Sequence, residues 1–309
     1  MTVAAFGLGL AALGRPGYMT LGHDGDLPDT SVSAMRDRCF EVLDEAWRLG
    51  LRHVDTARSY GLGEAFLSEW IASRAPTGLV VSSKWGYRYT AGWRRTADVH
   101  EVKDHSRAHL DAQWRQSRAL LGRALSVYQV HSLTPDSPLL ADDDVQHRLA
   151  ELRDEAGLSL GASVSGPRQG ELVDRLVALE RNGRRLFDWV QATWNVLERS
   201  AGPALGRAHE AGMRVIIKEA LANGRLTARG DVEAVTQAAR DLQTSPDALA
   251  LAIARCQPFA DVVLCGAASV TQLRSNLSGI GLSVTPDSLS SVTQPAMEYW
   301  NFRTQLKWS

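Results

Sequence analysis

The sequence has 309 residues, a hydrophobic fraction of 44%, a charged fraction of 22% and a formal net charge of −1 at pH 7. A chain of this length buries enough apolar surface to fold without disulfides or structural metals. Its near-zero net charge gives no electrostatic reason to expect nucleic acid or an anionic membrane as a partner. The cysteines, Cys39, Cys256 and Cys265, are odd in number and match no zinc spacing, and no apolar run is long enough to span a membrane. We therefore expect a cytoplasmic protein with one domain over residues 1–309.

Short apolar runs recur along the chain and are separated by segments with helical periodicity. Such continuous apolar runs are typical of parallel strands that are covered on both faces. Strands that alternate with helices predict a parallel sheet, and eight such units predict an α/β fold, the (β/α)8 TIM barrel. The predicted strands are 3–8, 51–55, 79–84, 125–131, 158–164, 187–193, 213–218 and 261–265.

Three of the intervening helices have clear boundary signals. The segment 35–49 has apolar residues at helical spacing and ends at Gly50, which suits a left-handed helix stop. A run of aspartates at 142–144 predicts a second helix start, because carboxylates stabilise the positive end of a helix. Ser245 followed by Pro246 predicts a third, with serine as the cap and proline in the first helical position.

Two segments are too long for simple connections, a loop over residues 85–103 and a C-terminal tail over residues 287–309, and both are rich in aromatic residues. Long loops of a barrel commonly shape its ligand site. The alternative is that these aromatic side chains cover hydrophobic surface. We expect substrate contacts from Trp85, Tyr87, Trp93, Trp194 and Trp300.

Polar residues close three of the predicted strands: Asp55 ends the second, Lys84 the third and His131 the fourth. Because catalytic groups of a barrel sit at the C-terminal ends of its strands, these side chains are expected to meet. Tyr60 follows Asp55 closely enough to reach the same place across one loop. The alternative is a structural ion pair between Asp55 and Lys84, with His131 as a core residue.

Together these four residues suit the reduction of a carbonyl, which needs a hydride on carbon and a proton on oxygen. A free tyrosine has a pKa of about 10 and is a poor acid near neutrality. We expect the Lys84 ammonium to lower the pKa of Tyr60, with Asp55 orienting Lys84. His131 is expected to hydrogen-bond the substrate oxygen and to share the proton transfer.

The motif D-T-A-x-x-Y-G over 55–61, with Lys84 and His131 on the following strands, resembles the catalytic tetrad of the aldo-keto reductase superfamily. The resemblance covers nearly the whole chain. It implies reduction of an aldehyde, ketone or sugar-like carbonyl with NADPH, and a small carbonyl or alcohol as the partner. It leaves the oligomeric state open.

The cofactor is expected near the loops after the seventh and eighth strands, where barrels commonly bind phosphate. Residues 266–276 look like a helix start with free amides, and they resemble the superfamily's stretch for the adenosine phosphates. Arg274 is expected at the 2′-phosphate of NADPH. The expected cofactor-binding residues are Gly9, Ser163, Ser165, Gln191, Lys218, Leu221, Gly224, Arg225, Gly266, Ser269, Gln272, Arg274 and Asn276.

The chain departs from the superfamily at three cofactor positions, one of which is Trp194-Asn195 where Tyr-Asn is usual. The usual Ser-Asn after strand five is Ser163-Val164, with Ser165 as a candidate substitute. The aromatic residue that often stacks under the nicotinamide is Lys218, which cannot stack as a ring does. Two compensations are open: stacking by Trp194, or pairing of Lys218 with Glu219 to serve the phosphates.

Two other functions are compatible with these residues. One is a cofactor-binding regulatory subunit, because the potassium-channel β subunits resemble the same superfamily. The other is a barrel lyase that uses Lys84 to form a Schiff base.

The run from His100 to His105 resembles the zinc motif H-E-x-x-H but has one residue too many, so the histidines would not share a helix face. We expect no bound metal.

Overall fold

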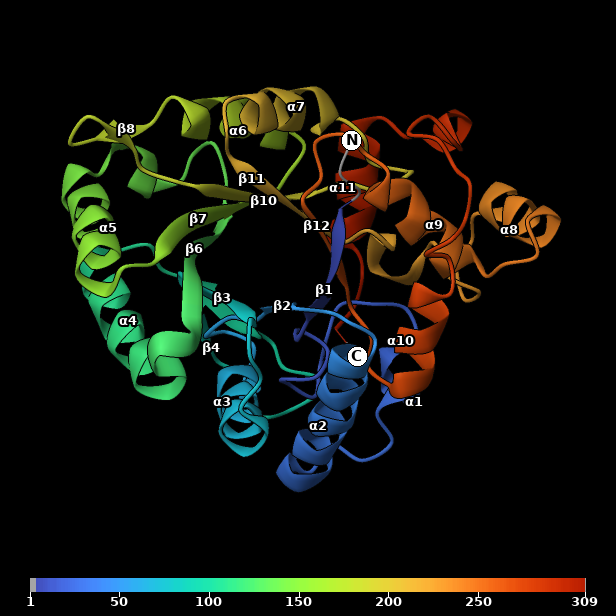
Figure 1. The fold of residues 1–309 in the computed structure, drawn as a ribbon, viewed down its shortest axis with the longest axis horizontal. Coiled ribbons are helices and arrows are strands. Elements are labelled where there is room, and N and C mark those ends of the chain that lie inside the picture. The colour runs from blue at the N-terminus through green and yellow to red at the C-terminus, as the bar shows by residue number, and fades with distance from the viewer. Residues whose placement is uncertain (1–3, 309) are drawn as a thin grey trace.

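The computed structural model describes residues 4–308 and shows a closed barrel of parallel strands surrounded by helices (Figure 1). The strand order around the barrel is β1-β12-β11-β10-β7-β6-β3-β2. All eight predicted strands are present close to their expected ends, although residue 3 of the first lies outside the described residues. The strands are β1 (Ala5–Gly9), β2 (His53–Asp55), β3 (Val80–Trp85), β6 (Leu125–Leu133), β7 (Ser159–Val164), β10 (Trp189–Thr193), β11 (Arg214–Lys218) and β12 (Val262–Cys265).

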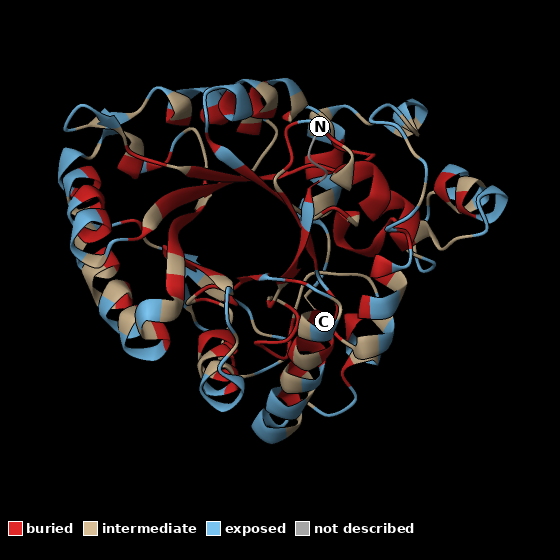
Figure 2. Ribbon diagram, in the orientation of Figure 1, coloured by how far each residue is buried: buried red, intermediate tan, exposed pale blue. Residues whose placement is uncertain are grey.

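Helices cover the outside of the barrel, so that the strands are buried on both faces (Figure 2). No helix within residues 4–308 has the length and apolar character needed to cross a membrane. The helices are α1 (His23–Asp26), α2 (Val32–Arg48), α3 (Gly63–Arg74), α4 (Arg107–Leu121), α5 (Asp143–Ala156), α6 (Gln169–Val177), α7 (Gly202–Glu210), α8 (Glu233–Asp241), α9 (Pro246–Arg255), α10 (Val270–Leu277) and α11 (Ala296–Thr304).

The helix boundary signals act as expected. Asp142 caps α5 by accepting a hydrogen bond from the amide of Val145 at 3.1 Å, and Gly157 ends the helix in the left-handed region with φ of 63°. Ser245 caps α9 in the same way, since its hydroxyl accepts from the amide of Ala248. Each cap satisfies a backbone group that the helix itself leaves unpaired.

The long segment over residues 85–103 is not a plain loop. It contains a short antiparallel hairpin of β4 (Tyr87–Tyr89) and β5 (Glu101–Lys103); a second hairpin, β8 (Glu180–Arg181) and β9 (Arg184–Arg185), lies elsewhere in the chain. Near the end of the tail, the ring of Trp308 stacks on His100 with centroids 4.2 Å apart and an angle of 10°. The tail therefore packs against the segment that follows β3.

The loop after β1 packs against the loop after β2, and Gly14 makes the contact. The amide of Leu62 donates to the Gly14 carbonyl oxygen at 2.8 Å. A Cβ atom at Gly14 would lie 2.3 Å from the carbonyl oxygen of Tyr60 and 2.8 Å from the Cα atom of Gly63. Both are backbone atoms, so a side chain here would displace the loop that carries Tyr60.

We expect Gly14→Ala to lower the free energy of unfolding by about 1–3 kcal/mol, the usual cost of forcing extra atoms into a packed site. Urea denaturation measures it. The matched control is Gly25→Ala, because a Cβ atom at Gly25 would meet nothing within 4 Å. Equal stability of the two variants would show that the approach of Gly14 to Tyr60 is not a constraint.

Candidate active site

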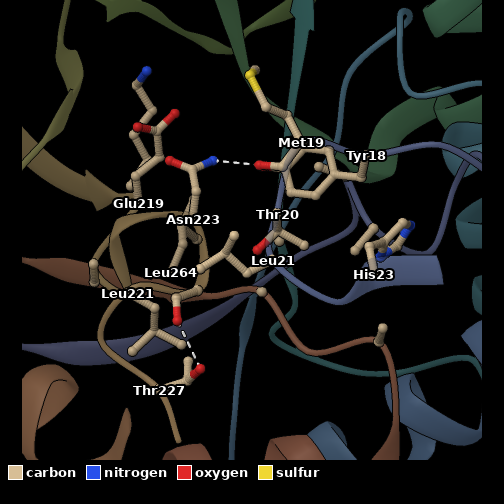
Figure 3. Close-up of a pocket in the computed structure, with 18 of the residues that line it drawn as sticks. Tyr18, Met19, Thr20, Leu21, His23, Glu219, Leu221, Asn223, Thr227 and Leu264 are labelled. Atoms are coloured by element: carbon tan, nitrogen blue, oxygen red, sulfur yellow. Dashed lines mark hydrogen bonds between the residues drawn. The ribbon is translucent and has the colours of Figure 1, made fainter. Parts of the chain in front are cut away.

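A cavity opens at the C-terminal end of the barrel strands, where the predicted catalytic residues meet. Figure 3 shows part of its wall. Its walls come from the strand ends and from the loops that follow β1, β11 and β12. Three of the four predicted catalytic residues line it, namely Asp55, Tyr60 and His131. Lys84 lies behind them, with 1% of its surface exposed.

The carboxylate of Asp55 is the centre of a buried hydrogen-bonded cluster. Its Oδ2 atom pairs with the ammonium of Lys84, as the sequence predicts. Its Oδ1 atom accepts from three uncharged donors on β3, β6 and β10: Ser82 Oγ at 2.6 Å, Gln129 Nε2 at 3.1 Å and Gln191 Nε2 at 3.1 Å. Both carboxylate oxygens therefore have donors, and the Lys84 ammonium compensates the charge.

Tyr60 lies over this ion pair, and Lys84 Nζ is 5.0 Å from the centre of its ring. The net shift of the Tyr60 pKa is upward, opposite to the lowering expected from the sequence, and Lys84 is not among its largest causes. Burial raises the pKa of Tyr60 well above its usual value and the Asp55 carboxylate raises it further, while Arg15 opposes both. Because burial and the Asp55 carboxylate both disfavour the tyrosinate, the Tyr60 hydroxyl stays protonated at neutral pH.

His131 completes the cluster, with its ring edge-on to that of Tyr60 at a centroid distance of 5.5 Å. Burial lowers the pKa of His131 well below its usual value, and the Lys84 charge acts in the same direction. The imidazole is therefore neutral near pH 7. Its Nδ1 atom lies 3.4 Å from Ser59 Oγ, and with Ser59 donating there, Nε2 carries the proton that can be donated to a substrate oxygen.

None of the five aromatic residues expected at the substrate lines the cavity. Tyr87 lies near it, with its ring 5.0 Å from that of His131. The other four are core or support residues: Trp85 packs on His105, Trp93 on Phe66, Trp194 on Phe259, and Trp300 on Tyr299. The aromatic side chains that line the cavity are Tyr18, Tyr60 and Trp308.

Most of the residues expected at the cofactor line the same cavity. They are Gly9, Ser163, Gln191, Lys218, Leu221, Gly224, Gly266, Gln272 and Asn276.

Four of the expected cofactor residues are not on the cavity wall, each for a visible reason. Arg274 turns outward and pairs with Glu45 of α2 at 2.7 Å, because its position on α10 faces that helix. Arg225 pairs with Asp231 at 3.1 Å. The hydroxyl of Ser269 caps α10, and Ser165 contacts the cavity indirectly through the Lys218 ammonium, at 2.9 Å.

Sequence reasoning missed the contribution of the loop after β1. Asn223 donates to the carbonyl oxygen of Met19 at 2.7 Å, which joins this loop to the one after β11 (Figure 3). Asp26 holds Arg229 across the same gap with an Nη1–Oδ2 distance of 2.7 Å. No periodicity or motif marks these contacts, because they form only where two distant loops meet.

The end of the cavity near Tyr60 also holds two ion pairs that sequence reasoning did not single out. Arg15 pairs with Glu101 at 2.8 Å, and Arg303 with Glu219 at 2.5 Å. Arg15 and Arg303 lie far from the motif in sequence. For Arg303, one feature of the sequence indicated that it lies near the site, namely its position in the aromatic tail.

The donors on the cavity wall fit a nicotinamide cofactor. Ser163 Oγ is buried and has no hydrogen-bond partner within residues 4–308, yet Ser163 lines the cavity. A buried hydroxyl without a partner is costly, so a polar ligand group is expected to bind it. At the other end, the N-terminal turn of α10 offers backbone amides, and Gln272 and Asn276 line the wall there.

The histidine-rich run at 100–105 forms no metal site in the described part of the chain. It lies on and beside β5 rather than on a helix. His100 stacks on Trp308, and His105 Nε2 lies 3.1 Å from the carbonyl oxygen of His131. These histidines therefore support the hairpin and the site.

Comparison with known families agrees with this geometry. The model of the aldo/keto reductase family matches residues 16–295. The chain belongs to the aldo/keto reductase family. Its membership supports a carbonyl-reducing oxidoreductase, and aldo/keto reductases generally use nicotinamide cofactors.

Solved structures share the fold of this aldo/keto reductase. The holo form of an aldo-keto reductase from Bacillus halodurans has a TM-score of 0.72 at 20% identity, over 96% of this chain and 94% of that one. A glycerol dehydrogenase from Gluconobacter oxydans has a TM-score of 0.71 at 19% identity, over 94% and 91%. No curated protein matches the sequence.

We expect Lys84→Met to lower the free energy of unfolding by about 3–5 kcal/mol, because it leaves the Asp55 carboxylate buried without a counter-charge. The double variant Asp55→Asn/Lys84→Met removes both charges and should be more stable than Lys84→Met alone. Urea denaturation of the wild type, both single variants and the double variant measures this coupling. Purely additive losses would mean that the pair is not coupled in the folded state.

Proposed function

We propose that this aldo/keto reductase is an NADPH-dependent enzyme that reduces an aldehyde, ketone or sugar-like carbonyl, with Tyr60 as the general acid. The observation that carries the proposal is the cluster of Tyr60, His131 and the Asp55–Lys84 pair at one end of a cavity whose other end is lined by α10. A bound nicotinamide would supply the hydride. The residues of the chain would supply the proton and orient the carbonyl.

The charge states of the site support these roles. Burial keeps the Tyr60 pKa raised, so the hydroxyl carries its proton at neutral pH and can transfer it to the developing alkoxide. His131 is neutral and acts as a hydrogen-bond donor rather than as a charged acid. Arg15 lies 5.0 Å from the centre of the Tyr60 ring and is the cation that favours loss of the Tyr60 proton.

A Schiff-base lyase built on Lys84 has no support in this geometry. The Lys84 ammonium binds the Asp55 carboxylate and also donates to the Thr56 carbonyl oxygen at 3.0 Å. It is buried behind the cavity wall, whereas imine formation needs a neutral amine that the substrate can reach.

A cofactor-binding regulatory role shares the same cavity. Rapid-mixing measurement of NADPH oxidation with a panel of carbonyl compounds separates it from catalysis. Turnover with any member of the panel favours the enzyme, and cofactor binding without turnover favours the regulatory role.

We expect Tyr60→Phe to lower kcat by about 10²–10⁴-fold while cofactor binding is retained, because phenylalanine keeps the ring and removes only the proton donor. Steady-state kinetics and fluorescence titration measure the two effects. Tyr89→Phe is the matched control, since Tyr89 lies on the β4 hairpin and does not line the cavity. If Tyr60→Phe keeps more than about a tenth of kcat, another group is the acid.

Preference for NADPH needs a cation near the adenosine 2′ position, and Arg274 pairs with Glu45 instead of lining the cavity. Arg229 lines the cavity together with Gln272 and Ser275. Its guanidinium is oriented by Asp26, whose carboxylate also cancels part of its charge. An arginine fork suits a phosphate group, so we assign the 2′-phosphate contact to Arg229 and expect a modest preference.

We expect Arg229→Met to raise the Kd for NADPH about tenfold, equal to about 1.4 kcal/mol, and to change the Kd for NADH much less. Arg274→Met should leave both values unchanged, because Arg274 faces Glu45. Fluorescence titration of both cofactors into the wild type and each variant decides between the two arginines. Parallel weakening of NADPH and NADH in Arg229→Met would remove the 2′-phosphate assignment.

A further inference from the structure

Among the described residues, Lys218 is the cation at the end of the cavity near Tyr60 that forms no ion pair with a carboxylate. It ends β11 and lines the cavity, and its ammonium donates to Ser165 Oγ at 2.9 Å. Ser165 in turn donates to Ser132 Oγ at 3.3 Å. Within residues 4–308 Lys218 forms no ion pair, because the adjacent Glu219 is bound by Arg303.

Two of the positions at which the sequence departs from the superfamily lie at the hydrogen bond between Lys218 and Ser165. Val164 stands where an asparagine is usual, and Lys218 stands where an aromatic residue is usual. Trp194 cannot compensate, since it is 2% exposed and packs against Phe259. The Lys218 side chain crosses from the end of β11 to Ser165 beyond β7, so one side chain spans both positions.

We propose that Lys218 and Ser165 together hold the nicotinamide end of the cofactor, and that the Lys218 charge makes the protein bind the reduced cofactor more tightly than the oxidised one. This inference rests on the proposed function, which supplies the nicotinamide ligand. The hydrocarbon stem of Lys218 offers apolar surface in place of a ring. Its ammonium offers the hydrogen-bond donor that Val164 cannot provide.

The preference follows from the charge of the ligand. The oxidised nicotinamide ring carries a positive charge and the reduced ring carries none. A lysine ammonium in a site from which water is excluded repels the oxidised ring, and the repulsion is weakly screened there. The adenosine half of the cofactor is the same in both states, so it does not contribute to the difference.

Between neutral and mildly alkaline pH, Lys218 is the group at this site that changes its protonation state. Burial lowers the pKa of Lys218 to about 8, although the Glu219 carboxylate opposes this shift. Glu219 itself has a pKa of about 2, because Arg303 and Lys218 favour its charged form over the cost of burial. His131 stays neutral. The charged groups that face Lys218 are Glu219, Arg303, Lys84 and Asp55.

The first test uses the wild-type protein and two solution conditions. Fluorescence titration gives the Kd values of NADP+ and NADPH at about pH 6.5 and about pH 9.5, on either side of the Lys218 pKa. Below that pKa Lys218 is charged, so the ratio of the Kd of NADP+ to that of NADPH should be high. It should fall about tenfold as the pH rises and the ammonium loses its proton. A ratio that is independent of pH would overturn the inference.

The second test is Lys218→Met, which keeps a flexible apolar stem and removes the charge. At about pH 6.5 the Kd ratio should fall about tenfold relative to the wild type, and its pH dependence should disappear. Adenosine 2′,5′-bisphosphate, which lacks nicotinamide, should bind both proteins equally. Arg274→Ala is the control variant and should keep the wild-type ratio, because Arg274 faces Glu45.

The outcomes separate this inference from the function on which it rests. An unchanged ratio in Lys218→Met, or an equal loss of adenosine bisphosphate binding, overturns the role of Lys218 and leaves the reductase proposal intact. Failure of the wild type to bind either nicotinamide nucleotide overturns the proposed function itself.

Discussion

The buried ion pair between Asp55 and Lys84 is the constraint on which the rest of the site depends. Two charges inside a barrel are stable only if each finds a full set of partners. The strands provide them: β3 contributes Ser82, β6 contributes Gln129 and β10 contributes Gln191. The Asp55 carboxylate therefore has its full set of partners only when the barrel is closed.

The network continues below the carboxylate. His53 Nε2 lies 3.0 Å from Ser82 Oγ, and since Ser82 gives its proton to Asp55, His53 is the donor in this contact. Burial lowers the pKa of His53 to about 4, which keeps the ring neutral at neutral pH. A neutral His53 ring suits this position, because a second buried cation beside Asp55 would compete with Lys84 for its carboxylate.

Towards the cavity the same rule of charge compensation holds. Arg15 is matched by Glu101 and Arg303 by Glu219, so these side chains shape the wall while adding little net charge. Tyr60 and His131 are uncharged at neutral pH, and both are suited to donate hydrogen bonds to a carbonyl oxygen. Lys218 alone lacks a direct counter-ion here among the described residues, and this makes it the group that a change of charge in a ligand would affect most.

By itself the sequence determined the barrel, its strands and the meeting of Asp55, Tyr60, Lys84 and His131 at the strand ends, because apolar periodicity and strand-end polar residues are local signals. It also located much of the cavity wall. Only the tertiary structure decided which way side chains point and which distant segments meet. Arg274 pairs with Glu45, Trp194 packs in the core, and Arg229 and Trp308 line the cavity. These outcomes depend on helix rotation and loop packing, which no local pattern of residues encodes.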